Sequence, residues 1–128
     1  MGKMQRTKGQ AGEREFAKLI FEQTGIEVNR RIEQTRDSGH DLDFMDYAIE
    51  VKRAKELKLS SWWEQTVTNA LEVGKIPVLA YRLDNNKWKV VMSFRHTLNA
   101  FADCNMHDLE KIVEFRADGW FDYVRTRL

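Results

Sequence analysis

Apolar and polar positions repeat along the first half of the chain with two different periods. Residues 9–24 carry apolar side chains at three-four spacing, which predicts a helix ending at Gly25. Alternating patterns then predict strands at 26–32, 42–45 and 47–53. Only Met45 and Asp46 separate the last two strands, so we expect them to form a hairpin.

The second half of the chain predicts one long helix, further strands and a final helix. Ser61 and Glu64 have the spacing of a capping box, so we expect Ser61 to cap a helix that ends near Val73. The remaining elements are expected as strands at 77–83, 88–92 and 112–115, a short helix at 94–101 and a last helix capped by Asp118. This order predicts an α/β domain with a mixed β-sheet flanked by helices.

One predicted strand carries charges on one of its faces. Side chains alternate sides along a strand, so Ile49 and Val51 face one way while Glu50 and Lys52 face the other. Burial of the apolar pair directs a carboxylate and an ammonium together across the sheet. Such charges are costly beside a core unless they meet a partner, a metal ion or a phosphate.

Further acids near this strand suggest a metal-dependent phosphodiesterase. Asp41 and Glu50 supply the oxygen ligands that Mg²⁺ prefers, and the backbone carbonyl of Val51 is a further candidate ligand. Glu13 on the first helix is expected to reach the metal through water. Lys52 is positioned to hold the attacking water or the developing negative charge.

Several nearby residues leave alternatives open. Asp43 competes with Asp41, although Asp41 lies at the junction of loop and strand and is favoured. Gln65 is a possible accessory residue, with a solvated helix position as the alternative. For His40 we expect a solvent-facing side chain or a hydrogen bond within the loop rather than catalysis. Trp62 is expected to be partly exposed, with base stacking as an alternative.

Composition narrows the class of protein without selecting a function. With 128 residues and 42% hydrophobic residues, the chain predicts a single folded domain, 1–128, with a flexible basic start at 1–8. We expect neither a secretory signal nor a membrane span, and the lone Cys104 excludes a disulfide framework. A cytoplasmic location is expected. The net charge of +1 hides a local cluster of cations, namely Arg30, Arg31 and Arg36.

The order of these residues resembles a known enzyme family. The segment from Lys8 to Glu15 is similar to the opening of archaeal-type Holliday-junction resolvases. Ser38, Asp41 and the Glu50-x-Lys52 pair then follow in that family's order. The whole resembles the PD-(D/E)xK nucleases, and residues 49–82 are similar to small phage-encoded members.

The resemblance implies a restriction-endonuclease-like core and a Mg²⁺- or Mn²⁺-dependent endonuclease acting on branched DNA in the host-cell cytoplasm. Its active site would contain Glu13, Asp41, Glu50 and Lys52, and its DNA contacts would come from Lys8, Arg30, Arg31, Arg36, Ser38 and Arg53. Members of that family act as homodimers on four-way junctions during DNA recombination, and Trp120 and Phe121 are candidates for a share in dimer contacts. Position 69 is Asn where one nuclease branch has Tyr.

Two other functions remain as alternatives. The first is a less specific nuclease for branched or flap DNA. The second is a catalytically silent DNA-binding module with the same fold, against which the intact set of Asp, Glu and Lys residues argues.

Overall fold

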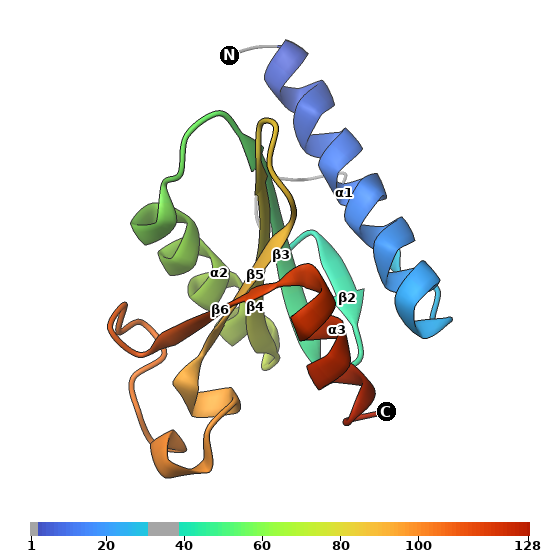
Figure 1. Cartoon of the computed structure of the whole chain (residues 1–128). Helices are drawn as coiled ribbons and strands as arrows, with labels where there is room; N and C mark the ends of the chain where they lie inside the picture. The colour runs from blue at the N-terminus through green and yellow to red at the C-terminus, as the bar shows by residue number, and fades with distance from the viewer. Residues whose placement is uncertain (1–2, 31–38) are drawn as a thin grey trace.

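The computed structural model describes residues 3–30 and 39–128 (Figure 1). Within these residues it contains three α-helices and one six-stranded sheet. The helices are α1 (Lys3–Thr24), α2 (Leu59–Val73) and α3 (Ala117–Arg125). The strands are β1 (Asn29–Arg30), β2 (Leu42–Phe44), β3 (Tyr47–Ala54), β4 (Ile76–Leu83), β5 (Lys89–Ser93) and β6 (Ile112–Arg116).

The strands lie in the sheet in the order in which they occur along the chain. β3 and β4 are parallel, with Glu50 beside Leu79 and Lys52 beside Tyr81, and α2 forms the crossover between them. The other described neighbours are antiparallel, so the sheet is mixed. The predicted fold class, a mixed sheet flanked by helices, is therefore confirmed.

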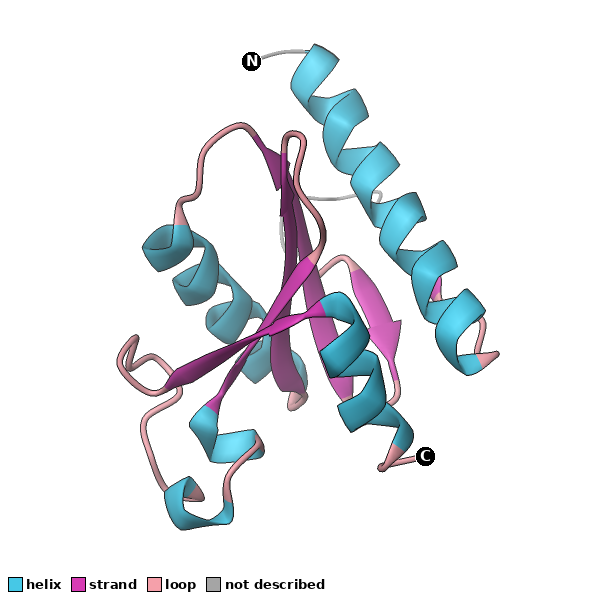
Figure 2. Ribbon diagram, in the orientation of Figure 1, coloured by secondary structure: helices cyan, strands magenta, loops and turns pink. Residues whose placement is uncertain are grey.

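Helices cover both faces of the sheet (Figure 2). α1 and α3 pack on one face, where Phe16, Trp88 and Trp120 join the apolar side chains of β2 to β5. α2 packs on the other face through Trp63 and Val67. Strands β4 and β5 contribute alternating side chains to both cores, which is the arrangement that period-two patterning predicts. None of the described helices has the length and apolarity to cross a membrane.

The hairpin around Met45 and Asp46 is confirmed, but two boundaries differ from the prediction. α1 begins at Lys3, so helical structure extends into the segment for which we expected a flexible start. β1 contains only Asn29 and Arg30, and the end of the strand predicted at 26–32 lies outside the described residues.

The two predicted N-caps are wrong. The N–H of Trp62 donates to the carbonyl of Lys58 at 3.0 Å, so α2 has already begun and Ser61 lies in its first turn. Ala117 continues directly from β6, which places Asp118 inside the first turn of α3. There its charge still complements the positive end of the helix dipole. The C-terminal end of α2 is as predicted, because Gly74 adopts φ 67° as its left-handed cap.

Other differences come from packing between distant segments. Residues 94–101 form two short 3₁₀ turns instead of one helix. Trp62 is buried against Tyr81, with ring centroids 5.8 Å apart, and is not partly exposed. Trp120 and Phe121 are fully buried in the core beneath α1 and α3, so the suggested dimer contacts through them are wrong for the described chain.

Candidate active site

Strand β3 carries its charged pair on the face covered by α2. Ile49 and Val51 belong to the core beneath α1 and α3, as the alternation predicts. Glu50 is only 3% exposed, and its Oε2 lies 3.6 Å from Nζ of Lys52. A buried carboxylate is therefore held next to a partly exposed ammonium at the same face of the sheet.

The chain brings Asp41 to this strand through its backbone. The Asp41 N–H donates to the carbonyl of Ile49 at 2.9 Å, just before β2 begins. Its carboxylate then accepts a hydrogen bond from the N–H of Val51 at 2.8 Å. The N–H and C=O of one strand residue point to the same edge, so the Val51 carbonyl points toward the side on which Asp41 lies.

Glu13 joins the two acids from helix α1, where its side chain hydrogen-bonds with Asp41. The approach of α1 to β3 depends on Gly12, because a Cβ there would lie 2.6 Å from Cγ of Arg53. One turn along the same helix, Glu15 forms ion pairs with Arg53 and with Arg82. These contacts fix α1 over β3 and β4 and so place Glu13 beside the acids.

Burial and mutual repulsion weaken the acidity of this cluster. Burial raises the pKa of Asp41 to about 8, and the neighbouring charges of Glu50 and Glu13 add to the effect. Burial also raises the pKa of Glu50, although Lys52 and Asn69 oppose the change. Carboxylates whose negative charges repel one another in a desolvated site favour a bound cation.

The residues present fit a divalent cation of the Mg²⁺ type. No group of three or more His, Cys, Asp or Glu side chains among the described residues is arranged to hold a metal ion. Mg²⁺ commonly takes only one or two carboxylates and completes its shell with water and substrate. Asp41 and Glu50, with the Val51 carbonyl, meet that requirement.

The competing acid, Asp43, lies in a different environment. Its Oδ1 is 3.0 Å from Nζ of Lys75 and 2.5 Å from Nε2 of His40. These contacts hold the pKa of Asp43 below its usual value, although desolvation opposes them. His40 is buried and its ring hydrogen-bonds with Asp43 of β2, so the expected hydrogen bond is confirmed and the solvent-facing alternative is wrong. The structure thus places Asp41, rather than Asp43, with Glu50.

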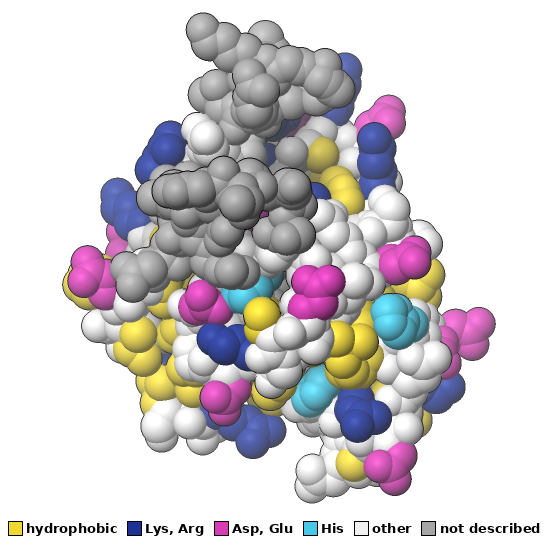
Figure 3. Space-filling view, turned by 180° about the vertical axis from the view of Figure 1, so that it is seen from behind, with side chains coloured by type: hydrophobic (Ala, Val, Ile, Leu, Met, Phe, Trp, Pro, Cys, Tyr) yellow, Lys and Arg dark blue, Asp and Glu magenta, His cyan; other side chains and the backbone are white. Residues whose placement is uncertain are grey.

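Only some of the proposed DNA-binding residues can be located. Lys8 forms an ion pair with Asp84 at 2.7 Å, and Arg53 pairs with Glu15 at 3.2 Å. The side chain of Arg30 lies outside the described part of the chain, as do the whole of Arg31, Arg36 and Ser38. On the face opposite that of Figure 1, acidic and basic side chains are interspersed where described atoms are visible (Figure 3).

Helix α2 contributes a residue that the sequence interpretation did not assign. Gln65 is exposed on this helix. One turn later, Asn69 is buried and its Nδ2 donates to Oε1 of Glu50 at 3.2 Å. A polar residue within the buried stripe of α2 was the available signal.

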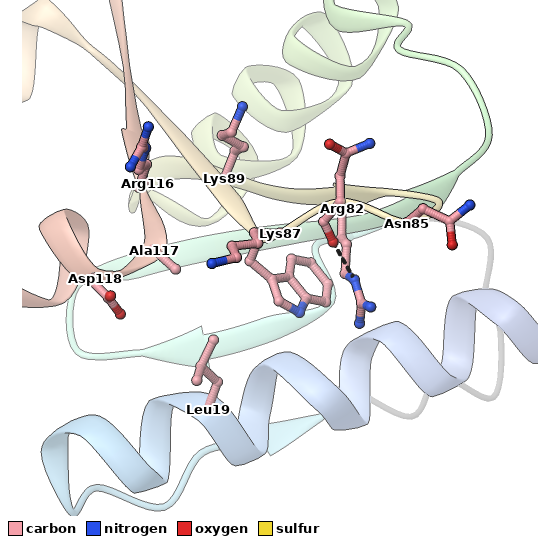
Figure 4. A pocket seen from close by; sticks show the side chains of 10 residues that line it. Leu19, Arg82, Asn85, Lys87, Lys89, Arg116, Ala117 and Asp118 are labelled. Atoms are coloured by element: carbon pink, nitrogen blue, oxygen red, sulfur yellow. Dashed lines mark hydrogen bonds between the residues drawn. The ribbon is translucent and has the colours of Figure 1, made fainter.

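A separate cavity of about 670 Å³ lies between the β4–β5 turn, α1 and the start of α3 (Figure 4). Its lining includes Leu19, Arg82, Lys87 and Arg116, but none of the clustered acids. The guanidinium of Arg82 bonds to Glu15 and to the carbonyl of Asn86. The candidate active site is therefore not this cavity. It is the acidic cluster around β3, which consists of Glu13, Asp41 and Glu50.

The fold and the site together define a nuclease class: a mixed sheet that presents Asp, Glu-x-Lys and a helical Glu at one place. Residues 4–118 match the family model described as "Phage putative PDDEXK endonuclease", and the chain belongs to this family. The endonuclease class predicted from the sequence is that of this family.

A solved structure is also similar to the chain. It is Hjc from Archaeoglobus fulgidus, described as a Holliday junction resolvase from an archaeal hyperthermophile. The two sequences are 28% identical, the match covers 65% of this chain and 70% of Hjc, and the TM-score is 0.48. No curated protein sequence matches the chain.

Proposed function

We propose that the protein is a metal-dependent endodeoxyribonuclease that resolves four-way DNA junctions by paired nicks, with Mg²⁺ or Mn²⁺ as its cofactor. The observation that carries the proposal is the half-buried Asp41 beside the buried Glu50, with Lys52 3.6 Å from the second acid. Without a cation, the two carboxyl groups can avoid mutual repulsion in this site only by holding a proton.

Each residue of the cluster has a distinct role in this proposal. Asp41, Glu50 and the Val51 carbonyl would hold the ion, and Glu13 would support it through water. The bound ion would activate water and neutralise charge on the phosphate. Lys52 orients the attacking water or stabilises negative charge as the new phosphorus–oxygen bond forms and the bond to the leaving oxygen breaks.

The choice of branched DNA rests on the order of the motifs along the chain. The basic opening at Lys8, the helical Glu13, Asp41 and Glu50-x-Lys52 follow one another as in the archaeal-type resolvases. Resolution requires cuts in two opposed strands, and a homodimer would supply the two active sites. Arg30, Arg31 and Arg36, which precede Ser38, are the proposed phosphate contacts.

The experiment is cleavage of a labelled four-way junction, with linear duplex and flap DNA of the same sequence as controls, in Mg²⁺ and in EDTA. We expect symmetric paired nicks in the junction only, and only with the metal. Cleavage of all three substrates would retain the metal nuclease and replace the resolvase with a less specific enzyme. Tight junction binding without cleavage would contradict an enzyme and favour the binding module.

A further inference from the structure

Asn69 occupies a position between the two segments that carry the acids. Its side chain lies on the buried face of α2 and is 8% exposed. Its Nδ2 donates to Oε1 of Glu50 at 3.2 Å and to the backbone carbonyl of Gly39 at 3.2 Å. An amide NH₂ group has two donors, so both are used here.

The first of these bonds defines the orientation of the Glu50 carboxylate. Asn69 contacts one oxygen, Oε1, while Nζ of Lys52 lies 3.6 Å from the other, Oε2. The carboxylate is held from two sides, by α2 and by its own strand. Rotation of the carboxylate about its terminal bond would break the contact with Asn69.

The second bond fastens the loop that leads to Asp41. Gly39 lies two residues before Asp41 and has φ 98°, a backbone conformation that residues other than glycine rarely adopt. Asn69 binds the Gly39 carbonyl on one side of this turn, and Val51 binds the Asp41 carboxylate on the other. One amide therefore connects the loop of the first acid with the carboxylate of the second.

We propose that Asn69 is a positioning residue that sets the separation and orientation of Asp41 and Glu50. The inference rests on the proposed function, because the relative placement of the two acids matters most if they hold one cation. Asn69 itself binds neither metal nor DNA. Loss of a residue that orients a metal ligand typically lowers metal affinity or activity by about 10- to 100-fold.

The test is Mn²⁺ binding to the full chain, measured by calorimetry without DNA, for the wild type and for Asn69→Leu. Leucine keeps nearly the volume of the side chain but removes both donors. Thr68→Ala, at the exposed neighbouring position of α2, is the matched control. We expect Asn69→Leu to weaken Mn²⁺ binding by about 10- to 100-fold and Thr68→Ala to leave it within about twofold.

Cleavage supplies a second readout. In Asn69→Leu, the metal concentration for half-maximal junction cleavage should rise in parallel with the Kd, while metal-free DNA binding should not change. Circular dichroism verifies that the variant folds, and Asn69→Ala replaces it if it does not.

Two outcomes would overturn the inference. A folded Asn69 variant with wild-type Mn²⁺ affinity would reject the positioning role and leave the proposed function intact. A wild-type protein that neither binds Mn²⁺ nor cleaves DNA would reject the proposed function and this inference with it.

Discussion

The backbone N–H of Val51 donates a hydrogen bond to the carboxylate of Asp41 at 2.8 Å. This bond joins the end of a loop to the centre of β3, ten residues further along the chain. It places the Asp41 carboxylate next to the strand that carries Glu50 and Lys52, at the edge toward which the Val51 carbonyl also points. A local hairpin thereby assembles most of the candidate site, and helix α1 adds Glu13.

DNA binding should survive the loss of either central acid. Above about pH 8 in EDTA, where Asp41 is ionised in the folded chain, Asp41→Ala or Glu50→Ala removes a negative charge that repels phosphate, so affinity for a junction should stay equal or increase. Fluorescence anisotropy with a labelled junction measures this directly. Weakening of more than about tenfold in a folded variant would show that these acids support DNA binding instead of opposing it.

The raised pKa of Asp41 predicts that the metal-free protein loses stability as pH rises. The unfolded chain releases this proton near pH 3.8, whereas the folded chain keeps it up to about pH 8. Below pH 3.8 both states hold the proton, so Asp41 does not make the unfolding free energy depend on pH. Between pH 3.8 and about pH 8 only the folded state holds it, so the unfolding free energy falls as pH rises. At pH 8 in EDTA, Asp41→Asn should be more stable than the wild type, because its side chain carries no charge that burial and the neighbouring acids would penalise.

Urea unfolding of both proteins at several pH values measures this difference, which should shrink toward pH 4. Asp46→Asn, at an exposed turn position, is the control and should show no such trend. An Asp41→Asn variant that is less stable than the wild type at pH 8 would contradict the electrostatic account.

Two glycines of α1 should respond in opposite ways to the same substitution. Nothing lies within 4 Å of a Cβ built at Gly9, so Gly9→Ala should stabilise the helix by about 0.5–1 kcal/mol. At Gly12 the new Cβ meets Arg53 at 2.6 Å and must displace a side chain that pairs with Glu15. Gly12→Ala should therefore lower the unfolding free energy.

Urea denaturation compares the two variants under identical conditions. Because Gly12 determines how closely α1 approaches β3, Gly12→Ala should also slow junction cleavage, whereas Gly9→Ala should not. Equal stabilisation by both substitutions would mean that α1 does not need this close contact.

Affinity for DNA should fall steeply with salt. Each phosphate that a protein cation neutralises releases counterions. The affinity for DNA should therefore fall by about tenfold or more when the salt concentration is raised from about 50 to 200 mM. Replacing Arg30, Arg31 and Arg36 with alanine should make the affinity less dependent on salt. Lys18→Ala, at an exposed position of α1, should leave the salt dependence unchanged. A flat response in the wild type would exclude the arginine cluster as the main phosphate contact.

The sequence was sufficient to predict the parts of the site that depend on local geometry. The faces of Ile49, Glu50, Val51 and Lys52 follow from the strand period, and the hairpin follows from the two-residue gap at Met45 and Asp46. Both features are set by neighbours in the chain. They do not depend on which elements pack against the hairpin.

The parts that depend on docking of distant elements could not be predicted in this way. Helical spacing places both Gln65 and Asn69 on α2, but the rotation of the helix on the sheet decides which one contacts Glu50. That rotation is set by the packing of Trp63 and Val67, which form a core with residues of β4 and β5. Burial of Trp62 against Tyr81 likewise requires the crossover from β3 to β4.

The most direct test of the central claim is single-turnover cleavage of a labelled four-way junction in Mg²⁺ by the wild type and by Glu50→Gln. Glutamine keeps the size of this side chain while removing its charge. We predict metal-dependent cleavage by the wild type and a loss of at least about a thousandfold in the folded variant, with junction binding retained. Cleavage by Glu50→Gln at the wild-type rate would contradict the assignment of the acidic cluster on β3 as the active site.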